Sequence, residues 1–323
     1  MLRSVFSPHS HDAAASIDPA VEASGDGIRA LRLSLAGLAI TALLQLLIVL
    51  VTGSVALLAD TFHNFTDALT AAPLWIAFSL ARRAPTRRFT HGYGRAEELA
   101  GIFIVAMIAL SAGVAAWESI HRLLAPQEIT NVGWVVVAGV IGFAGNELVA
   151  LYRIRVGRAI GSAALVADGL HARTDGLTSL AVVAGALGVA AGYPVADPIV
   201  GLLISVAILF VLKGAATSIY HRMMDGVDPA LVDRVERVLL STDGIESIDT
   251  LRLRWIGHEL RAEAEVVSDF KLSLSEAHAI AERARHRLFH EVPRLTQAII
   301  HTSPNARDGR DHHAELAHHL DPS

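Results

Sequence analysis

Apolar residues form six long blocks in the first two thirds of the chain. Each block is long enough for an α-helix that crosses a hydrocarbon core of about 30 Å, which takes about 20 residues. The blocks centre on Leu31 to Thr52, Val55 to Ala81, Leu99 to Leu123, Val132 to Tyr152, Ala159 to Ala190 and Ile199 to Ile219. The pattern predicts six transmembrane helices, with both termini on one side of the membrane.

After Asp225 the pattern becomes that of a soluble protein. Asp228 and Pro229 predict a helix start, with an N-cap followed by a proline in the first turn, and this helix runs to about Ser241. Alternating and amphipathic stretches then predict strands at Ser247 to Trp255 and Glu259 to Val267, a helix at Leu274 to Phe289 and a strand at Leu295 to Thr302. The α-β-β-α-β order fits a small ferredoxin-like domain.

These patterns divide the chain into four parts. We expect a disordered N-terminal tail over residues 1–29 and a six-helix transmembrane domain over 30–224. The soluble α/β domain follows over 225–304, and a disordered His-containing tail over 305–323 ends the chain. The tail histidines either collect metal weakly or have no role.

Two of the apolar blocks contain the same polar frame. SVALLADTFHNFTDALT runs from Ser54 to Thr70, and SAALVADGLHARTDGLT runs from Ser162 to Thr178. Both copies contain A-D-x-x-H-x-x-T-D. At about 100° per residue, the two Asp and the His of each copy fall within a sector roughly 100° wide. Each helix therefore offers one polar stripe on an apolar surface.

The two stripes predict a metal site inside the membrane. A carboxylate at the bilayer centre costs at least ~2.5 kcal/mol, so two matched stripes favour a function over a buried polar network. If the helices face each other, two imidazoles and two carboxylates converge, from His63, Asp67, His171 and Asp175. This set suits tetrahedral zinc, with cobalt and cadmium as companions, whereas magnesium and calcium need more oxygen ligands. Protons would compete with the metal for the same groups.

Composition limits the alternatives. Hydrophobic residues make up 52% of the 323 positions, and mean hydropathy is +0.45, which is typical of a membrane protein. The formal net charge of -5 gives no indication of nucleic-acid binding. Cysteine is absent, which excludes disulfides and thiolate metal sites. The chain has no G-x-x-x-x-G-K-[ST] motif, so an ATP-driven mechanism is not expected.

The placement of arginine predicts the orientation. Arginines gather in residues 82–95 and 153–158, whereas the opposite loops hold almost nothing basic beyond Arg122. The positive-inside rule therefore places both termini in the cytoplasm. Compact loops and frequent Ala and Arg favour a bacterial inner membrane.

Paired H-x-x-x-D motifs in the second and fifth of six helices, followed by a soluble domain, resemble the cation diffusion facilitator family of metal/proton antiporters. The resemblance implies that the four predicted ligands form the transport site of the zinc-transporting branch. It also implies roles for Asp60 and Asp168, which lie one turn before each His. They either guide ions or orient the His as hydrogen-bond acceptors outside the metal's own ligands. The soluble domain would pair two copies into a homodimer.

The resemblance extends to two further groups of residues. HGYGRAE, residues 91–97, resembles the family's signature before the third helix, and implies that Arg95 pairs with Asp225 to hold the dimer in register. The resemblance also implies a reduced, weaker regulatory zinc site. Its residues would be Asp249, Glu263, His278 and His301.

Several alternatives remain open at this point. An intramembrane zinc hydrolase would need three protein ligands, an open position and a general base, and the chain contains no H-E-x-x-H. A metal sensor without transport is a further option. Glu147 is a proton site, a partner for a neighbouring helix or a partner of Arg153. Arg173 faces away from the metal and either lines water or pairs with an acid.

Overall fold

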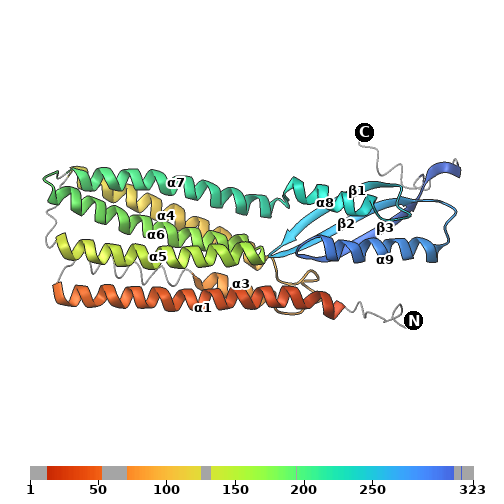
Figure 1. Ribbon diagram of the computed structural model, residues 1–323, viewed down its shortest axis with the longest axis horizontal. Coiled ribbons are helices and arrows are strands. Elements are labelled where there is room, and N and C mark those ends of the chain that lie inside the picture. The colour runs from red at the N-terminus through yellow and green to blue at the C-terminus, as the bar shows by residue number, and fades with distance from the viewer. Residues whose placement is uncertain (1–12, 53–70, 125–131, 194, 309–313, 315–323) are drawn as a thin grey trace, which may run out of the picture. The chain divides into compact units, whose positions relative to one another are not determined.

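The computed structural model describes residues 13–52, 71–124, 132–193, 195–308 and 314 (Figure 1). The chain divides into two compact units, the first covering Val21–Met224 and the second covering Asp225–Ser323 together with Met1–Ala20.

The first unit is helical. Its described helices are α1 (Ala13–Thr52), α3 (Ala71–Ala81), α4 (Ala96–Leu124), α5 (Val132–Ile160), α6 (Ala163–Ala190) and α7 (Ala196–Met223). Four of them, α1, α4, α5 and α7, contain segments long and apolar enough to cross a membrane. Helix α6 is of similar length but contains Asp168, Arg173 and Asp175, and α3 has 11 residues. Four spans are therefore confirmed by length and composition, and six remain a prediction.

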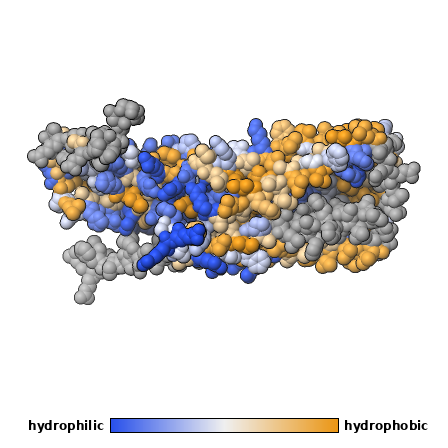
Figure 2. Space-filling view, turned by 180° about the vertical axis from the view of Figure 1, so that it is seen from behind, coloured by the Kyte–Doolittle hydropathy of each residue, from blue (hydrophilic) through white to orange (hydrophobic). Residues whose placement is uncertain are grey.

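Apolar side chains cover much of the outer surface of these helices (Figure 2). Leu50, Trp117 and Phe210 are each more than 70% exposed, on three different helices. Such a surface is unstable in water but matches the hydrocarbon of a bilayer. The first unit is accordingly a membrane domain.

Helix α1 begins at Ala13, so part of the predicted disordered tail over residues 1–29 is helical. The bounds of the disordered tail stay a prediction, which overlaps the first residues of α1. Alanine is the best helix former, and a helix extends more easily than it nucleates, so the apolar span of α1 continues toward the N-terminus.

Helices α5 and α6 run side by side with their backbones in close contact (Figure 1). A Cβ on Gly169 of α6 would lie 3.0 Å from the backbone nitrogen of Ile154 and 3.1 Å from the Ala150 carbonyl oxygen. A Cβ on Gly157 of α5 would lie 2.9 Å from the backbone nitrogen of Val166. Glycine at these positions allows the close approach, as in small-residue interfaces of membrane helices.

The second unit is an α/β domain with the predicted element order. It consists of α8 (Pro229–Leu240), β1 (Ser247–Ile256), β2 (Glu259–Ser268), α9 (Leu274–Glu291) and β3 (Leu295–Pro304). Strand β2 is central, antiparallel to β1 and parallel to β3. Buried Val266, Leu260 and Leu288 contribute to the core between the sheet and the helices. The predicted α-β-β-α-β order is confirmed.

Both helices of this domain start with side-chain caps. Asp228 accepts a hydrogen bond from the Ala230 N–H at 2.9 Å, which confirms the predicted N-cap of α8. At the start of α9, Ser273 and Glu276 form a reciprocal capping box. Hydrogen bonds from the Ser273 backbone and hydroxyl hold the pKa of Glu276 below its ordinary value.

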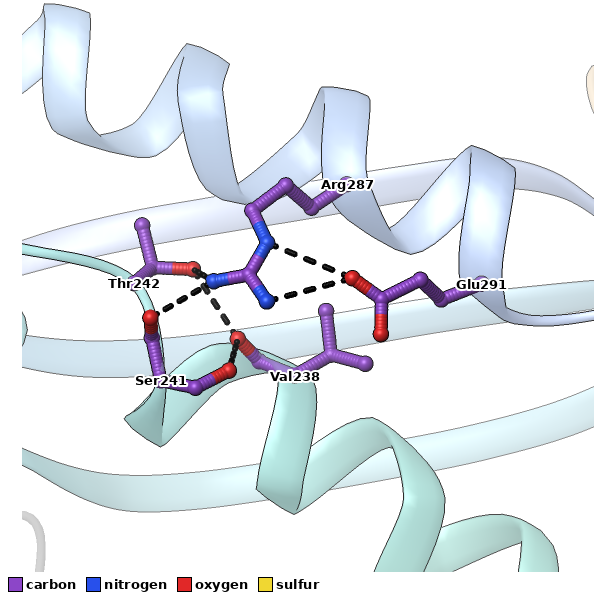
Figure 3. Close-up of polar contacts among 5 residues, drawn as sticks. All are labelled: Val238, Ser241, Thr242, Arg287 and Glu291. Atoms are coloured by element: carbon purple, nitrogen blue, oxygen red, sulfur yellow. Dashed lines mark hydrogen bonds and ion pairs between the residues drawn. The ribbon is translucent and has the colours of Figure 1, made fainter.

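Arg287 of α9 closes the C-terminal end of α8 (Figure 3). Its Nη1 donates to the Ser241 carbonyl oxygen at 2.6 Å and to Thr242 Oγ1 at 3.3 Å. On the other side, Arg287 Nη2 lies 3.1 Å from Glu291 Oε1, and this contact orients the guanidinium. The carbonyls at the end of a helix lack partners within the helix, so this arginine joins the two helices through a group that otherwise depends on water.

We expect Arg287→Ala to loosen α8. Loss of a hydrogen bond from a charged group to a partly exposed carbonyl should cost about 1 kcal/mol, or about fivefold faster amide exchange. Hydrogen exchange of the α8 amides in the full-length protein measures this. Arg285→Ala is the matched control, because Arg285 pairs only with Glu282 on its own helix among the contacts described. Equal exchange rates in the two variants would contradict the role of Arg287.

Candidate metal site

Helix α6 presents two of the four predicted ligands together. His171 is 1% exposed and Asp175 is 5% exposed, and His171 Nδ1 lies 3.9 Å from Asp175 Oδ1. The i, i+4 spacing places the two side chains on one face of the helix. The other two predicted ligands, His63 and Asp67, and the neighbouring Asp60 lie outside the described residues.

The hydroxyl groups around this pair are bonded within α6. Thr174 Oγ1 donates to the His171 carbonyl oxygen at 2.7 Å, and Ser179 Oγ donates to the Asp175 carbonyl oxygen at 3.2 Å. At the start of the helix, the Ser162 hydroxyl accepts from the Leu165 N–H at 3.0 Å. Because these hydroxyls bond to the backbone, the imidazole of His171 and the carboxylate of Asp175 are the groups of this segment that suit a divalent metal.

Asp168 belongs to the same stripe but has a different neighbour. Its Oδ2 lies 2.9 Å from Arg153 Nη1 of α5, and the two side chains are 0% and 2% exposed. The predicted role of Asp168 beside the metal stays a prediction. Its observed partner is a buried arginine.

A second ion pair joins the same two helices. Arg173 of α6 donates to both carboxylate oxygens of Glu147 on α5, at 2.7 and 3.1 Å. The prediction that Glu147 is a partner for a neighbouring helix is therefore confirmed, and so is the pairing of Arg173 with an acid. The acid that Arg153 contacts is Asp168 and not Glu147. The antiparallel register brings Arg173 level with Glu147, whereas Arg153, on the same helix as Glu147, lies opposite Asp168.

The predicted regulatory ligands are spread over the second unit. Glu263 pairs with Arg254 at 2.9 Å, and Asp249 lies at a β-bulge in β1. Within the described part of the chain, no group of three or more His, Asp or Glu side chains is placed to hold a metal ion. The regulatory site of Asp249, Glu263, His278 and His301 stays a prediction.

Arg95 takes part in a network at one end of the helical unit. Its Nη1 donates to the Arg222 carbonyl oxygen at 3.3 Å, and Arg222 Nη2 donates to the Gly161 carbonyl oxygen at 2.8 Å. These bonds tie the beginning of α4 to the end of α7 and to the turn between α5 and α6. The pairing of Arg95 with Asp225 remains a prediction.

One polar cluster was missed by the sequence analysis. Arg122 of α4 contacts Glu118 at 2.9 Å and Asp197 of α7 at 3.1 Å. The three line a cavity of about 120 Å³ between α4, α6 and α7. The i, i+4 spacing of Glu118 and Arg122 was a usable signal, but the contact with Asp197 depends on the packing of the helices.

Comparison with known proteins covers both units. Residues 31–217 match the family described as cation efflux transmembrane domain, and residues 227–305 match the one described as cation efflux protein, cytoplasmic domain. A probable cation efflux system protein of Mycobacterium tuberculosis is 58% identical, over 94% of this chain and 92% of its own.

Two more distant relatives also match most of the chain. A cadmium, cobalt and zinc/H(+)-K(+) antiporter of Bacillus subtilis is 28% identical, over 81% of this chain and 88% of its own. The magnetosome protein MamB of Paramagnetospirillum magneticum is 27% identical, over 79% of this chain and 86% of its own.

Proposed function

This chain belongs to the cation efflux family of divalent-metal transporters, and on that basis we propose that it exports zinc from the cytoplasm in exchange for protons. Cobalt and cadmium are further substrates in this proposal, as the name of the Bacillus subtilis relative supports. Family members are multi-pass membrane transporters and not enzymes, which removes the intramembrane hydrolase from consideration.

The observation that carries the proposal is the buried pair of His171 and Asp175, one turn apart on α6. Imidazole and carboxylate groups in a membrane helix are costly unless they serve an ion pathway or a partner. We propose that His63 and Asp67, in the first copy of the repeated frame, complete a tetrahedral site with this pair. Each copy then supplies half of the site.

The exchange of metal for protons follows from the ligand chemistry. Zinc binds only the neutral imidazole and the ionised carboxylate, so its binding releases protons and its departure allows them to return. When the helices rock toward the outer side, protons at the higher outside concentration compete with zinc for the same groups. The proton gradient therefore drives the metal outward without a nucleotide.

The proposed topology has six spans, with the second predicted over residues 55–81, which include α3, and the fifth formed by α6. Both termini lie in the cytoplasm of a bacterium, as the arginine distribution supports. The domains cover residues 30–224 and 225–304. The C-terminal domain pairs two copies into a homodimer, with Arg95 and Asp225 holding the halves in register.

Reconstitution tests this function. Purified protein in proteoliposomes with an imposed proton gradient should move zinc in one direction and protons in the other, in amounts that scale together. A fluorescent zinc indicator and a pH indicator, read in the same vesicles, measure the two fluxes. Zinc binding without flux would leave the metal sensor as the better description, and zinc flux that does not depend on the proton gradient would contradict antiport.

A further inference from the structure

The ion pair between Arg153 and Asp168 is buried but incompletely bonded. Arg153 is 1% exposed and Asp168 is 0% exposed. Among the described residues, no hydrogen-bond partner is found for Arg153 Nε and Nη2 or for either carboxylate oxygen of Asp168, and the 2.9 Å contact between them is an ion pair only. A buried pair in this state is poor at stabilising a fold, so its presence calls for another reason.

The position of Asp168 supplies that reason. It lies about 4.5 Å before His171 along the helix axis, at 1.5 Å per residue, and in the same sector as His171 and Asp175. The close contact of Gly169 with the backbone of α5 fixes this turn of α6. The stripe on α6 thus contains a second carboxylate besides that of Asp175, and Arg153 is placed against it.

We propose that Arg153 determines metal selectivity, because it neutralises Asp168 and keeps this second carboxylate of α6 out of the coordination of the transported ion. Zinc is satisfied by four ligands with nitrogen among them, whereas manganese prefers six ligands that are mainly oxygen. A free Asp168 would add oxygen ligands to the site and would favour the harder ion. This inference rests on the proposed function, in which the α6 stripe holds the transported metal.

Arg153→Met tests this proposal. The substitution keeps an apolar chain of similar length and frees the carboxylate, so the affinity for manganese relative to zinc should rise at least tenfold. Arg153→Met combined with Asp168→Leu should return the ratio to that of the wild type, because the extra carboxylate is gone. The charge-reversed pair Arg153→Asp with Asp168→Arg should also resemble the wild type, because α6 then offers no additional carboxylate.

The matched control is Arg173→Met, which breaks the other ion pair between α5 and α6 and leaves the stripe intact. Its manganese-to-zinc ratio should be unchanged. If Arg153→Met and Arg173→Met raise the ratio equally, the effect is a general loosening of the helix pair and the proposal fails. The proposal is also overturned if Arg153→Met leaves the manganese-to-zinc ratio unchanged. The same holds if Arg153→Met combined with Asp168→Leu keeps a raised ratio. Should Arg153→Met not fold, Arg153→Gln carries the same expectation with a neutral polar group.

Equilibrium dialysis of the full-length protein in detergent, against zinc and manganese together, gives the ratio. Binding that survives in an Asp175→Asn background is subtracted, which removes ions held elsewhere on the chain. Because equilibrium dialysis measures binding and not flux, it tests the role of Arg153 separately from the proposed transport function. A wild-type protein that binds zinc but does not transport it contradicts the proposed function, whereas the ratio in the variants decides the role of Arg153.

Discussion

Asp175→Asn is expected to abolish zinc transport, with zinc-dependent flux reduced by about 100-fold or more. Replacing even an outer partner of a metal ligand costs about 10- to 100-fold in affinity or activity, and a direct ligand should cost more. Asparagine has nearly the same shape but no charge, and Asp175 is 5% exposed, so little water is available to take the place of the carboxylate. The proton flux coupled to zinc should disappear with it.

The proteoliposome assay measures both fluxes, with Asp26→Asn as the matched control. Asp26 is an exposed aspartate on α1, so the same chemical change there should leave transport near the wild-type rate. Retention of zinc flux in Asp175→Asn would show that the transported ion does not use this carboxylate. Loss of flux in both variants would point to the assay or to folding, which the melting temperature of each purified variant then distinguishes.

Gly169→Ala is expected to lower the stability of the membrane domain by about 2–3 kcal/mol, the upper part of the range of about 1–3 kcal/mol for an overpacked core. The new Cβ would meet backbone atoms of α5, the Ile154 nitrogen at 3.0 Å and the Ala150 carbonyl oxygen at 3.1 Å, and backbone cannot rotate away as a side chain can. In an open helix the same change would stabilise by up to about 1 kcal/mol, since alanine has the higher helix propensity. The close approach of the helices reverses the sign.

Thermal unfolding in detergent should show a melting temperature about 5–10 °C lower, at a few degrees per kcal/mol for a domain of this size. The control is Gly113→Ala on α4, where an added Cβ meets nothing within 4 Å. That variant should melt at or slightly above the wild-type temperature. A Gly169→Ala protein as stable as Gly113→Ala would contradict the close packing of α5 on α6.

The sequence alone predicted much of the local structure. Apolar runs placed the helices α4, α5 and α7 within a few residues of their bounds, apart from the eight further residues of α5 as far as Ile160. The Asp228 cap and the alternation around Glu259 gave the order of the soluble domain. These features depend on residues near one another in the chain, so periodicity and capping are enough to find them. The sequence did not predict the start of α1 at Ala13, because a helix that extends into a polar segment shows no apolar pattern there.

The charge partners needed the structure. Glu147, Arg153, Asp168 and Arg173 were all visible in the sequence, but their pairing depends on which residues of α5 and α6 lie level in the antiparallel helix pair. That register is set by glycines such as Gly157 and Gly169, whose missing side chains allow the two backbones to meet. The same dependence explains Arg122 and Asp197, which are brought together from different helices.

The repeated frame by itself determined that the chain contains two matched sets of Asp, His and Asp, because their spacing is written in the sequence. Helical geometry then predicts one polar stripe for each set. It also fixed His171 and Asp175 as neighbours, since residues four apart on a helix share a face. Only the tertiary structure decided that Asp168, the third member of that stripe, lies against Arg153. The reason is physical: a contact within one helix follows from its repeat, whereas a contact between helices follows from how closely, and at what level, their backbones pack.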